Sequence, residues 1–394
     1  MRKIIALVTF MVWTLQMSAA DGISIANVSI PQGGEAIVEV QLESVQKKYG
    51  GFQFDLKLPA GITASTAIVQ ASRLSDIDGY TLMMNVTDAD KNIYTILGYN
   101  ATHTEIAGND GVVAYITLQA SSGTTVGNVL SATIQDVVIS TVTPENIDGA
   151  NSSFNITIIN ALQKVTLSET STTVPAATSN AVDVTVARTI KANEWSTICL
   201  PFAMSEAQVK SAFGSDAELA ELNSWSFEGT EDNVTSISIN FSIVKEIKQH
   251  FPYILMVSKD ISEFKVYNVK IGTKNKPQKK AFDEGQEYAA TMIGIYKAGT
   301  KVPENNLFLS NNKFYYSVGN SAIKGFRAYF DLDGIVLNEV NASRVFLSFN
   351  DNETTAIKNV NYETGSSYYS ISGQQVKNPA KGIYVKDGKK VIIK

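Results

Sequence analysis

The sequence has one cysteine and two histidines among 394 residues, and this scarcity excludes several kinds of site. Cys199 alone cannot form a disulfide within the chain, so stability has to come from hydrophobic cores. His103 and His250 are far apart in sequence, whereas nucleophilic catalysis needs a histidine beside the nucleophile. We expect Cys199 to be a buried apolar side chain and His250 to have a surface or turn role. A thiol pair of Cys199 with His250 is the alternative.

Long hydrophobic runs are also scarce. After the first 20 residues, no run approaches the 18 or so apolar residues of a membrane-spanning helix. The start combines Arg2 and Lys3, an apolar run over 4–13 and small residues at Ser18-Ala19-Ala20. This pattern predicts a secretory signal peptide over 1–20, cleaved after Ala20, with a membrane anchor as the alternative. A bacterial lipid anchor would need a cysteine just after the apolar run, and none stands there.

Positive charge is in deficit. Removal of Arg2 and Lys3 would leave 31 basic residues against 38 acidic ones, a net charge of −7. Nucleic acid attracts basic surfaces, so this balance argues against a nucleic-acid partner. Hydrophobic residues make up 44% and charged residues 18%, a globular composition, and the length favours two or three compact domains.

Short alternating runs fill residues 21–160. Apolar residues occupy every second position over 36–42, 52–58, 112–118 and 154–158. Turn-forming segments separate these runs, among them Pro31-Gln32-Gly33-Gly34 and Pro59-Ala60-Gly61. Alternation places one face of a strand in a core and the other in water. We therefore predict a β-sandwich over 21–160.

Residues 161–352 are predicted to form a second β-rich region. Further strand-like runs occur there over 182–186, 237–241, 265–271, 291–296, 313–318, 326–332 and 344–349. One helix of about three turns is predicted, because Ser205 and Gln208 have the spacing of a capping box and Gly214 supplies a stop. Ser168–Ser179, rich in Ser and Thr, is a predicted linker or lead-in. Trp195 is expected in the core of this region.

The last segment, 353–394, is predicted to be a small β unit. Asp387-Gly388 lies between two β-prone runs, which is a strong hairpin signal. The predicted fold class is therefore all-β: an N-terminal jelly-roll sandwich, a β-rich domain with one short helix, and a small C-terminal β unit.

Residues 23–158 resemble the cohesin-like modules of the carbohydrate-binding superfamily. The resemblance rests on elements in the expected order: the strand before Pro31-Gln32-Gly33-Gly34, the strand over 36–42, Gly51–Leu56 with Leu58–Ile62, Asn109–Ile116, and Asp136-Val137-Val138. It implies a jelly-roll sandwich. Cohesins bind a dockerin on a flat sheet face, and relatives in glycan-degrading systems occur in multi-domain surface proteins or bind polysaccharide. No contact residue matches position by position, so none is transferred.

The tail resembles the C-terminal sorting domains of type IX secretion. The similar segments are Tyr369–Val376, Lys381–Val385 and Gly388–Lys394. This resemblance implies display at, or release from, the outer cell surface.

Two aspartate clusters are the candidates for a metal site, Asp76-Ile77-Asp78-Gly79 and the segment from Asp88 to Asn92. The second begins like a calcium-binding EF-hand loop, but Ile93 stands where glycine is needed and Tyr99 where glutamate is needed. We expect both clusters to be solvated loops, and we predict no metal and no cofactor.

Aromatic side chains are the candidates for ligand binding, because sugar rings stack on flat aromatic faces. The predicted mature chain keeps Trp195 and Trp225 alone among its tryptophans. Tyr94, Tyr99 and Tyr115 lie in or near strands of the first region, and Tyr115 is on the polar side of its strand. Each is also a good β-forming residue, which is the competing explanation.

The sequence thus predicts a secreted or cell-surface binding or scaffold protein without catalytic residues. The cohesin-like region would engage a polysaccharide or a protein partner, and the C-terminal unit would permit association with the outer surface. The first alternative is a structural adhesin or matrix component that binds no glycan. The second is a glycan-active hydrolase whose two carboxylates are hidden among the 38 acidic residues.

Overall fold

The computed structural model describes residues 21–349, except for gaps at 44–47, 109, 144, 232, 275–276, 283–287 and 337–344, together with short strands within 368–393. The chain divides into two compact units, residues 1–350 and 351–394. The expected signal peptide over 1–20 lies outside the described residues. No described helix is long and apolar enough to span a membrane.

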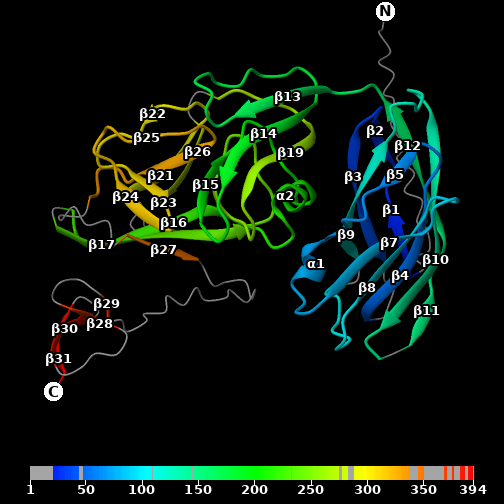
Figure 1. The fold of residues 1–394 in the computed structure, drawn as a ribbon, viewed down its shortest axis with the longest axis horizontal. Helices are drawn as coiled ribbons and strands as arrows, with labels where there is room; N and C mark the ends of the chain where they lie inside the picture. Colours follow the sequence, from blue (N-terminus) through cyan, green and yellow to red (C-terminus); the bar gives the residue numbers. More distant parts are fainter. Residues whose placement is uncertain are drawn as a thin grey trace, which may run out of the picture. The chain divides into compact units, whose positions relative to one another are not determined.

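The N-terminal region is a sandwich of two sheets (Figure 1). The first sheet has the order β1-β3-β9-β5, and β6 also pairs with β9. Its strands are β1 (Gly22–Ile25), β3 (Glu35–Glu43), β9 (Gly111–Ala120), β5 (Ile62–Ala64) and β6 (Val69–Gln70). The second sheet has the order β2-β12-β10-β4-β8-β7, with β11 on β10. Its strands are β2 (Val28–Pro31), β12 (Ser152–Ile159), β10 (Val129–Thr141), β4 (Tyr49–Lys57), β8 (Ile93–Tyr99), β7 (Thr81–Asp88) and β11 (Asn146–Asp148).

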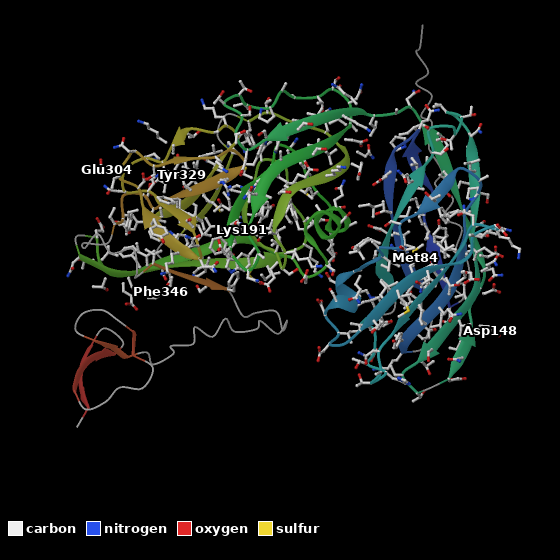
Figure 2. The ribbon with its side chains drawn as sticks, viewed as in Figure 1. Met84, Asp148, Lys191, Glu304, Tyr329 and Phe346 are labelled. Carbon is white, nitrogen blue, oxygen red and sulfur yellow. The ribbon has the colours of Figure 1, made fainter. Side chains whose placement is uncertain are left out.

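The inward faces of these two sheets form one hydrophobic core. Phe54, Leu56 and Ile134 are fully buried in it, and Met84 of β7, labelled in Figure 2, is 3% exposed. The predicted strands are confirmed, because β3, β9 and β12 cover the runs over 36–42, 112–118 and 154–158, and β4 covers 52–57. The alternation differs at Val112, which packs in the outward cluster of Tyr115 while Val113 enters the core. Antiparallel pairing of β4 with both β8 and β10 holds this register.

The second region is also built of strands, which confirms the predicted all-β class. One sheet has the order β13-β14-β19, with strands β13 (Gln163–Ser168), β14 (Val182–Ile190) and β19 (Ile261–Val269). A second has the order β15-β18-β16-β17-β27, with strands β15 (Ser196–Cys199), β18 (Pro252–Met256), β16 (Glu218–Thr230), β17 (Asn233–Val244) and β27 (Val345–Phe349).

A third sheet of the second region has the order β20-β21-β26-β23-β24. Its strands are β20 (Gln278–Phe282), β21 (Ala289–Ile295), β26 (Arg327–Asp331), β23 (Leu307–Ser310) and β24 (Lys313–Tyr316). A small pair joins β22 (Thr300–Lys301) to β25 (Ala322–Ile323). As expected, Trp195 is 8% exposed and lies in a core cluster here, and Cys199 is fully buried.

In the described part of the chain two helices interrupt the strands, α1 (Ser72–Ser75) and α2 (Glu206–Phe213). The capping box of α2 is confirmed: Ser205 accepts from the Gln208 backbone and the Gln208 side chain accepts from the Ser205 backbone. Gly214 follows the helix with a φ of 106°, a value that favours glycine. The helix is eight residues long, shorter than the predicted three turns, because Gly214 ends it before a third turn is complete.

The C-terminal unit contains a four-stranded sheet of order β29-β28-β30-β31. Its strands are β28 (Tyr368–Ser370), β29 (Gln375–Val376), β30 (Gly382–Lys386) and β31 (Lys389–Ile393). Antiparallel pairing of Lys386 with Lys389 closes the predicted hairpin. Asp387 and Gly388 themselves lie outside the described residues.

Candidate binding surface

The outward faces of the two sandwich sheets have different surroundings. On the first sheet, Tyr115 of β9 points outward and is 4% exposed, because it packs in a cluster with Ala71 and Ala207. Ala207 belongs to helix α2, so the second region covers this face of the sandwich. Burial and the charges of Glu206 and Glu39 raise the pKa of Tyr115. Tyr115 thus lies on the outward side of its strand, as predicted, but it is covered and a ligand cannot reach it.

Tyr94 and Tyr99 lie on opposite faces of β8. Tyr94 points into the core, is 5% exposed, and accepts a hydrogen bond at its hydroxyl from the backbone of Ala64 (3.2 Å). It is not accessible to a ligand, which corrects the second candidate. Tyr99 is 42% exposed on the outward face of the second sheet. Of the three tyrosines predicted as ligand-binding candidates, Tyr99 is the one that a partner can reach.

The outward face of β7, β8, β4 and β10 is the candidate binding surface, here named the outer sheet face. Its middle row runs across the four strands through Met83, Leu97, Gln53 and Val138, which the pairing registers place opposite one another. Met83 is 37% exposed. Leu97 and Val138 are half-buried and Gln53 is exposed. Apolar side chains thus line most of this row and remain open to solvent.

Two flanking rows complete the outer sheet face. Asn85, Thr95, Asp55 and Gln135 form a polar row on one side, and Thr95 donates to Asp55 (2.5 Å). Tyr99 lies on the other side, next to Gly51 of β4. The face therefore has an apolar centre that includes methionine, with a tyrosine and a polar row beside it. This is the composition that protein-binding surfaces favour.

A β-bulge in β10 aims two of these residues outward. The pairing of β10 with β4 shifts between Gln135 and Val138, where Asp136 adopts a φ of 53°. Val137 turns into the core at 3% exposure, while Gln135 and Val138 both stay on the outer sheet face. A bulge commonly redirects side chains in this way.

The residues with the chemistry for covalent catalysis meet in an inert arrangement. The Tyr296 hydroxyl lies 2.5 Å from His250 Nδ1 and also interacts with Cys199. Burial raises the pKa of Cys199 to about 12, so at neutral pH the thiol is protonated and not nucleophilic. His250 sits in a turn with a φ of 67°, and burial followed by the charge of Lys274 lowers its pKa. The thiol-pair alternative for Cys199 and His250 finds no support in this geometry.

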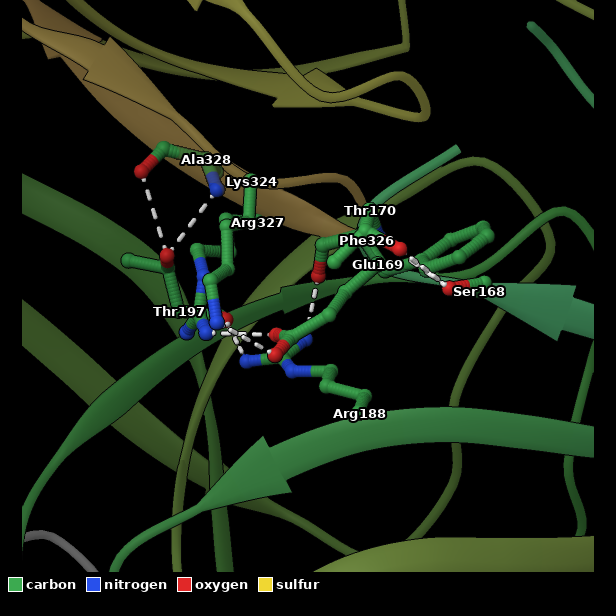
Figure 3. A network of polar contacts seen from close by, with 9 residues as sticks. All are labelled: Ser168, Glu169, Thr170, Arg188, Thr197, Lys324, Phe326, Arg327 and Ala328. Atoms are coloured by element: carbon green, nitrogen blue, oxygen red, sulfur yellow. Dashed lines mark hydrogen bonds and ion pairs between the residues drawn. The ribbon is translucent and has the colours of Figure 1, made fainter. Parts of the chain in front are cut away.

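A second polar cluster of the second region is structural (Figure 3). Glu169 binds Lys324 (2.8 Å) and Arg327 (2.7 Å). Arg188 is fully buried and donates to the backbone carbonyls of Thr197 (2.5 Å) and Phe326. Glu169 falls within the predicted linker, yet it is 5% exposed and ties that segment to the sheets.

Other candidate sites carry no reactive groups. The groove between residues 159–167 and 176–182 is lined by aliphatic, amide and hydroxyl side chains and by no acid or base. Among the described residues, no group of three or more histidine, cysteine or acidic side chains is placed to hold a metal ion. Asp88, from one of the two aspartate clusters, instead pairs with Lys91 (2.9 Å) and accepts from its backbone.

Comparison with known proteins finds similarity in fold alone. No protein-family model and no curated protein matches the chain. Solved cohesin modules match about a third of it. The sixth cohesin of scaffoldin B from Acetivibrio cellulolyticus, solved in complex with a dockerin, is 16% identical over 35% of this chain and 99% of its own, with a TM-score of 0.31.

Two further matches are similar in extent. A non-cellulosomal cohesin from Archaeoglobus fulgidus is 21% identical over 35% of this chain and 91% of its own, with a TM-score of 0.28. A cohesin module from a Clostridium perfringens family 33 glycoside hydrolase is 11% identical over 36% and 99%, with a TM-score of 0.30.

Proposed function

We propose that this chain is a binding protein without catalytic activity that engages a partner protein through the outer sheet face. The observation that carries the proposal is the row of Met83, Leu97 and Val138, an apolar strip open to solvent on a sheet. The other outward face of the sandwich is already covered by helix α2. A flat face with methionine and tyrosine suits a protein partner, since both residue types are enriched at such interfaces.

The setting we propose is the cell surface or the extracellular space. The signal-like start and the sorting-like tail both support export. An exported protein can be stable without disulfides when its hydrophobic cores are large, and Phe54 and Phe330 are fully buried in two such cores. The cohesin solved with a dockerin is a precedent for a protein partner, and in this chain a protein partner remains our proposal.

Polysaccharide is the second candidate ligand, favoured by the exposed ring of Tyr99. A single accessible tyrosine with apolar neighbours is a sparse sugar site. The polar row through Asn85, Thr95 and Asp55 would have to supply the hydrogen bonds to hydroxyls. We therefore rank it below the protein partner.

The test compares three full-length chains immobilised in parallel: the wild type, Met83→Glu, and Val129→Glu. Val129 is 61% exposed at the start of β10, on the same side of the sheet as Gln135 but beyond the three rows, so it is a control for a charge placed on this sheet away from the proposed contact. Proteins captured from the culture medium of the source organism are identified and then titrated in purified form. The same chains are applied to a panel of immobilised polysaccharides.

We expect that one captured protein, once purified, binds the wild type and the Val129→Glu chain with equal affinity. It should bind the Met83→Glu chain at least tenfold more weakly. Binding of a polysaccharide instead, lost on Tyr99→Ala, would replace it with the second candidate. Binding of a protein that is insensitive to Met83→Glu would overturn the assignment of the face.

A further inference from the structure

Strand β7 ends its sheet, and nothing in the described part of the chain pairs with its far edge. Its one strand partner there is β8. Along a strand, backbone N–H and C=O groups point alternately to the two sides. Those of β7 that point away from β8 therefore lie along an open edge eight residues long, which is a template for another strand.

Apart from a bulge between Val86 and Asp88 at its end, β7 lacks the usual protection of an edge strand. Natural edges carry lysine, proline or inward charges, or are very short. The opposite edge of the same sheet, β2, is four residues long and ends at Pro31. The edge strand β20 carries Lys279 and Lys280. In contrast, β7 has no lysine and no proline, and its one charge, Asp88, stands at its end.

The core face of β7 is apolar along the strand, and Met83 is the one apolar side chain on its outward face, beside Thr81, Asn85 and Thr87. Val86 pairs with buried Tyr94 and so lies on the core face, yet it is 49% exposed because no further strand covers it. Leu82, on the same face, is also only partly buried. Met83 is exposed on the outward face. A strand added at this edge would remove apolar surface of Leu82 and Val86 from water, which is favourable.

We propose that two copies of this chain pair through β7, antiparallel about a two-fold axis at Met84. In this register Leu82 faces Val86 of the second copy and Met83 faces its Asn85, while Thr81 faces Thr87. Each exposed apolar side chain of the core face thus gains an apolar neighbour, and no two charges of the same sign stand opposite each other. The contact is isologous and closes on itself, as in most homodimers.

The strand is self-complementary, and this favours a second copy over an unrelated strand. The same register satisfies both chains, and it joins the two six-strand paths into one continuous sheet. The two outer sheet faces then lie side by side. This inference does not rest on the proposed function, because it concerns the edge of the sheet and is tested without any partner.

Sedimentation of the purified full-length protein over a concentration series tests the proposal. We expect the wild type to change from monomer to dimer with increasing concentration. Val86→Lys places a positive charge at the apolar contact and is expected to weaken association at least tenfold. Val129→Lys, at a site on an interior strand that is 61% exposed against 49% for Val86, should associate like the wild type. Circular dichroism and thermal melting establish that each variant is folded.

A cross-linking experiment tests the register. A chain with Met83→Cys is mixed with a chain carrying Asn85→Cys under mild oxidation. The mixture should form several-fold more covalent dimer than either chain alone, since directly opposed residues are within disulfide reach. A wild type that stays monomeric throughout, a dimer unaffected by Val86→Lys, or equal cross-linking in all samples would each overturn the proposal.

Discussion

Glu206, the first residue of helix α2, accepts a hydrogen bond from the backbone nitrogen of Ser72 (3.2 Å) and another from its hydroxyl. Ser72 begins helix α1 of the sandwich. Lys210, one turn along α2, donates to the backbone of Gln70 (3.2 Å) and to Ser75 (3.0 Å). Together with Tyr115 and Ala207, these contacts fasten the second region to the first sandwich sheet and leave the outer sheet face as the open one.

Replacing Glu206 with alanine should loosen this attachment. The Ser72 donors would lose their acceptor, and Lys210 would lose a carboxylate 3.7 Å away. We expect a loss of about 1–3 kcal/mol in the free energy of unfolding, typical of a buried donor left unpaired. Urea unfolding followed by tryptophan fluorescence and by circular dichroism measures it, since both tryptophans of the described region, Trp195 and Trp225, lie outside the sandwich. If the variant unfolds at the wild-type urea concentration, the contact is not structural.

Glu169 should make the stability depend on acid. Burial would raise its pKa, but the hydrogen bond from Lys324 and the charges of Arg327 and Lys324 outweigh it and the pKa is lowered. Its contribution is therefore present above the ordinary glutamate pKa and is lost as the pH falls through the lowered value of the folded state. Glu169→Gln should remove this part of the acid sensitivity and lower the free energy of unfolding by about 3 kcal/mol at pH 7. Arg327 and Lys324 would lose their carboxylate partner, and fully buried Arg188 would lose the nearby negative charge.

Urea unfolding of the wild type and Glu169→Gln between pH 3 and 7 measures that difference. Asp260→Asn is the control, because Asp260 pairs with Lys191 on the surface and both side chains are 59% exposed. The surface pair should contribute little. If the free energies of unfolding of the wild type and Glu169→Gln differ by the same amount at every pH, the assigned role of the carboxylate is contradicted.

Cys199 should resist alkylation in the folded protein. Its side chain is fully buried and its pKa is about 12, so thiolate is scarce at pH 8. We expect iodoacetamide to label it only after unfolding in guanidinium, as measured by intact-protein mass spectrometry. Rapid labelling of the native protein would show an activated thiol and would restore the alternative of a thiol pair of Cys199 with His250.

The sequence predicted most of the strands because alternation reports which side chains enter a core. It also predicted helix α2, since Ser205, Gln208 and Gly214 act within a few residues of one another. It failed for Tyr115, because alternation cannot tell an outward face in water from one that another region covers. The face of Tyr94 was left open, because apolar residues occupy consecutive positions around it, at Ile93 and at Ile96-Leu97, and so no alternation assigns it to one side.

The outer sheet face itself was missed for a related reason. Met83 and Leu97 are 14 positions apart, and only the pairing of β7 with β8 brings them together. Val138 joins them through a bulge that the sequence marks with no glycine or proline. A weak signal was present in the alternation of Met83 and Asn85 with buried Met84.

The most direct test of the account is calorimetric titration of a purified partner, once identified, into three full-length chains. We predict that the double variant Met83→Glu/Tyr99→Ala binds at least a hundredfold more weakly than the wild type, since both side chains are exposed on the outer sheet face and a partner there would bury them. Val129→Glu should retain wild-type affinity. Equal affinity in all three chains, with circular dichroism showing each to be folded, would contradict the claim that the outer sheet face is the binding surface.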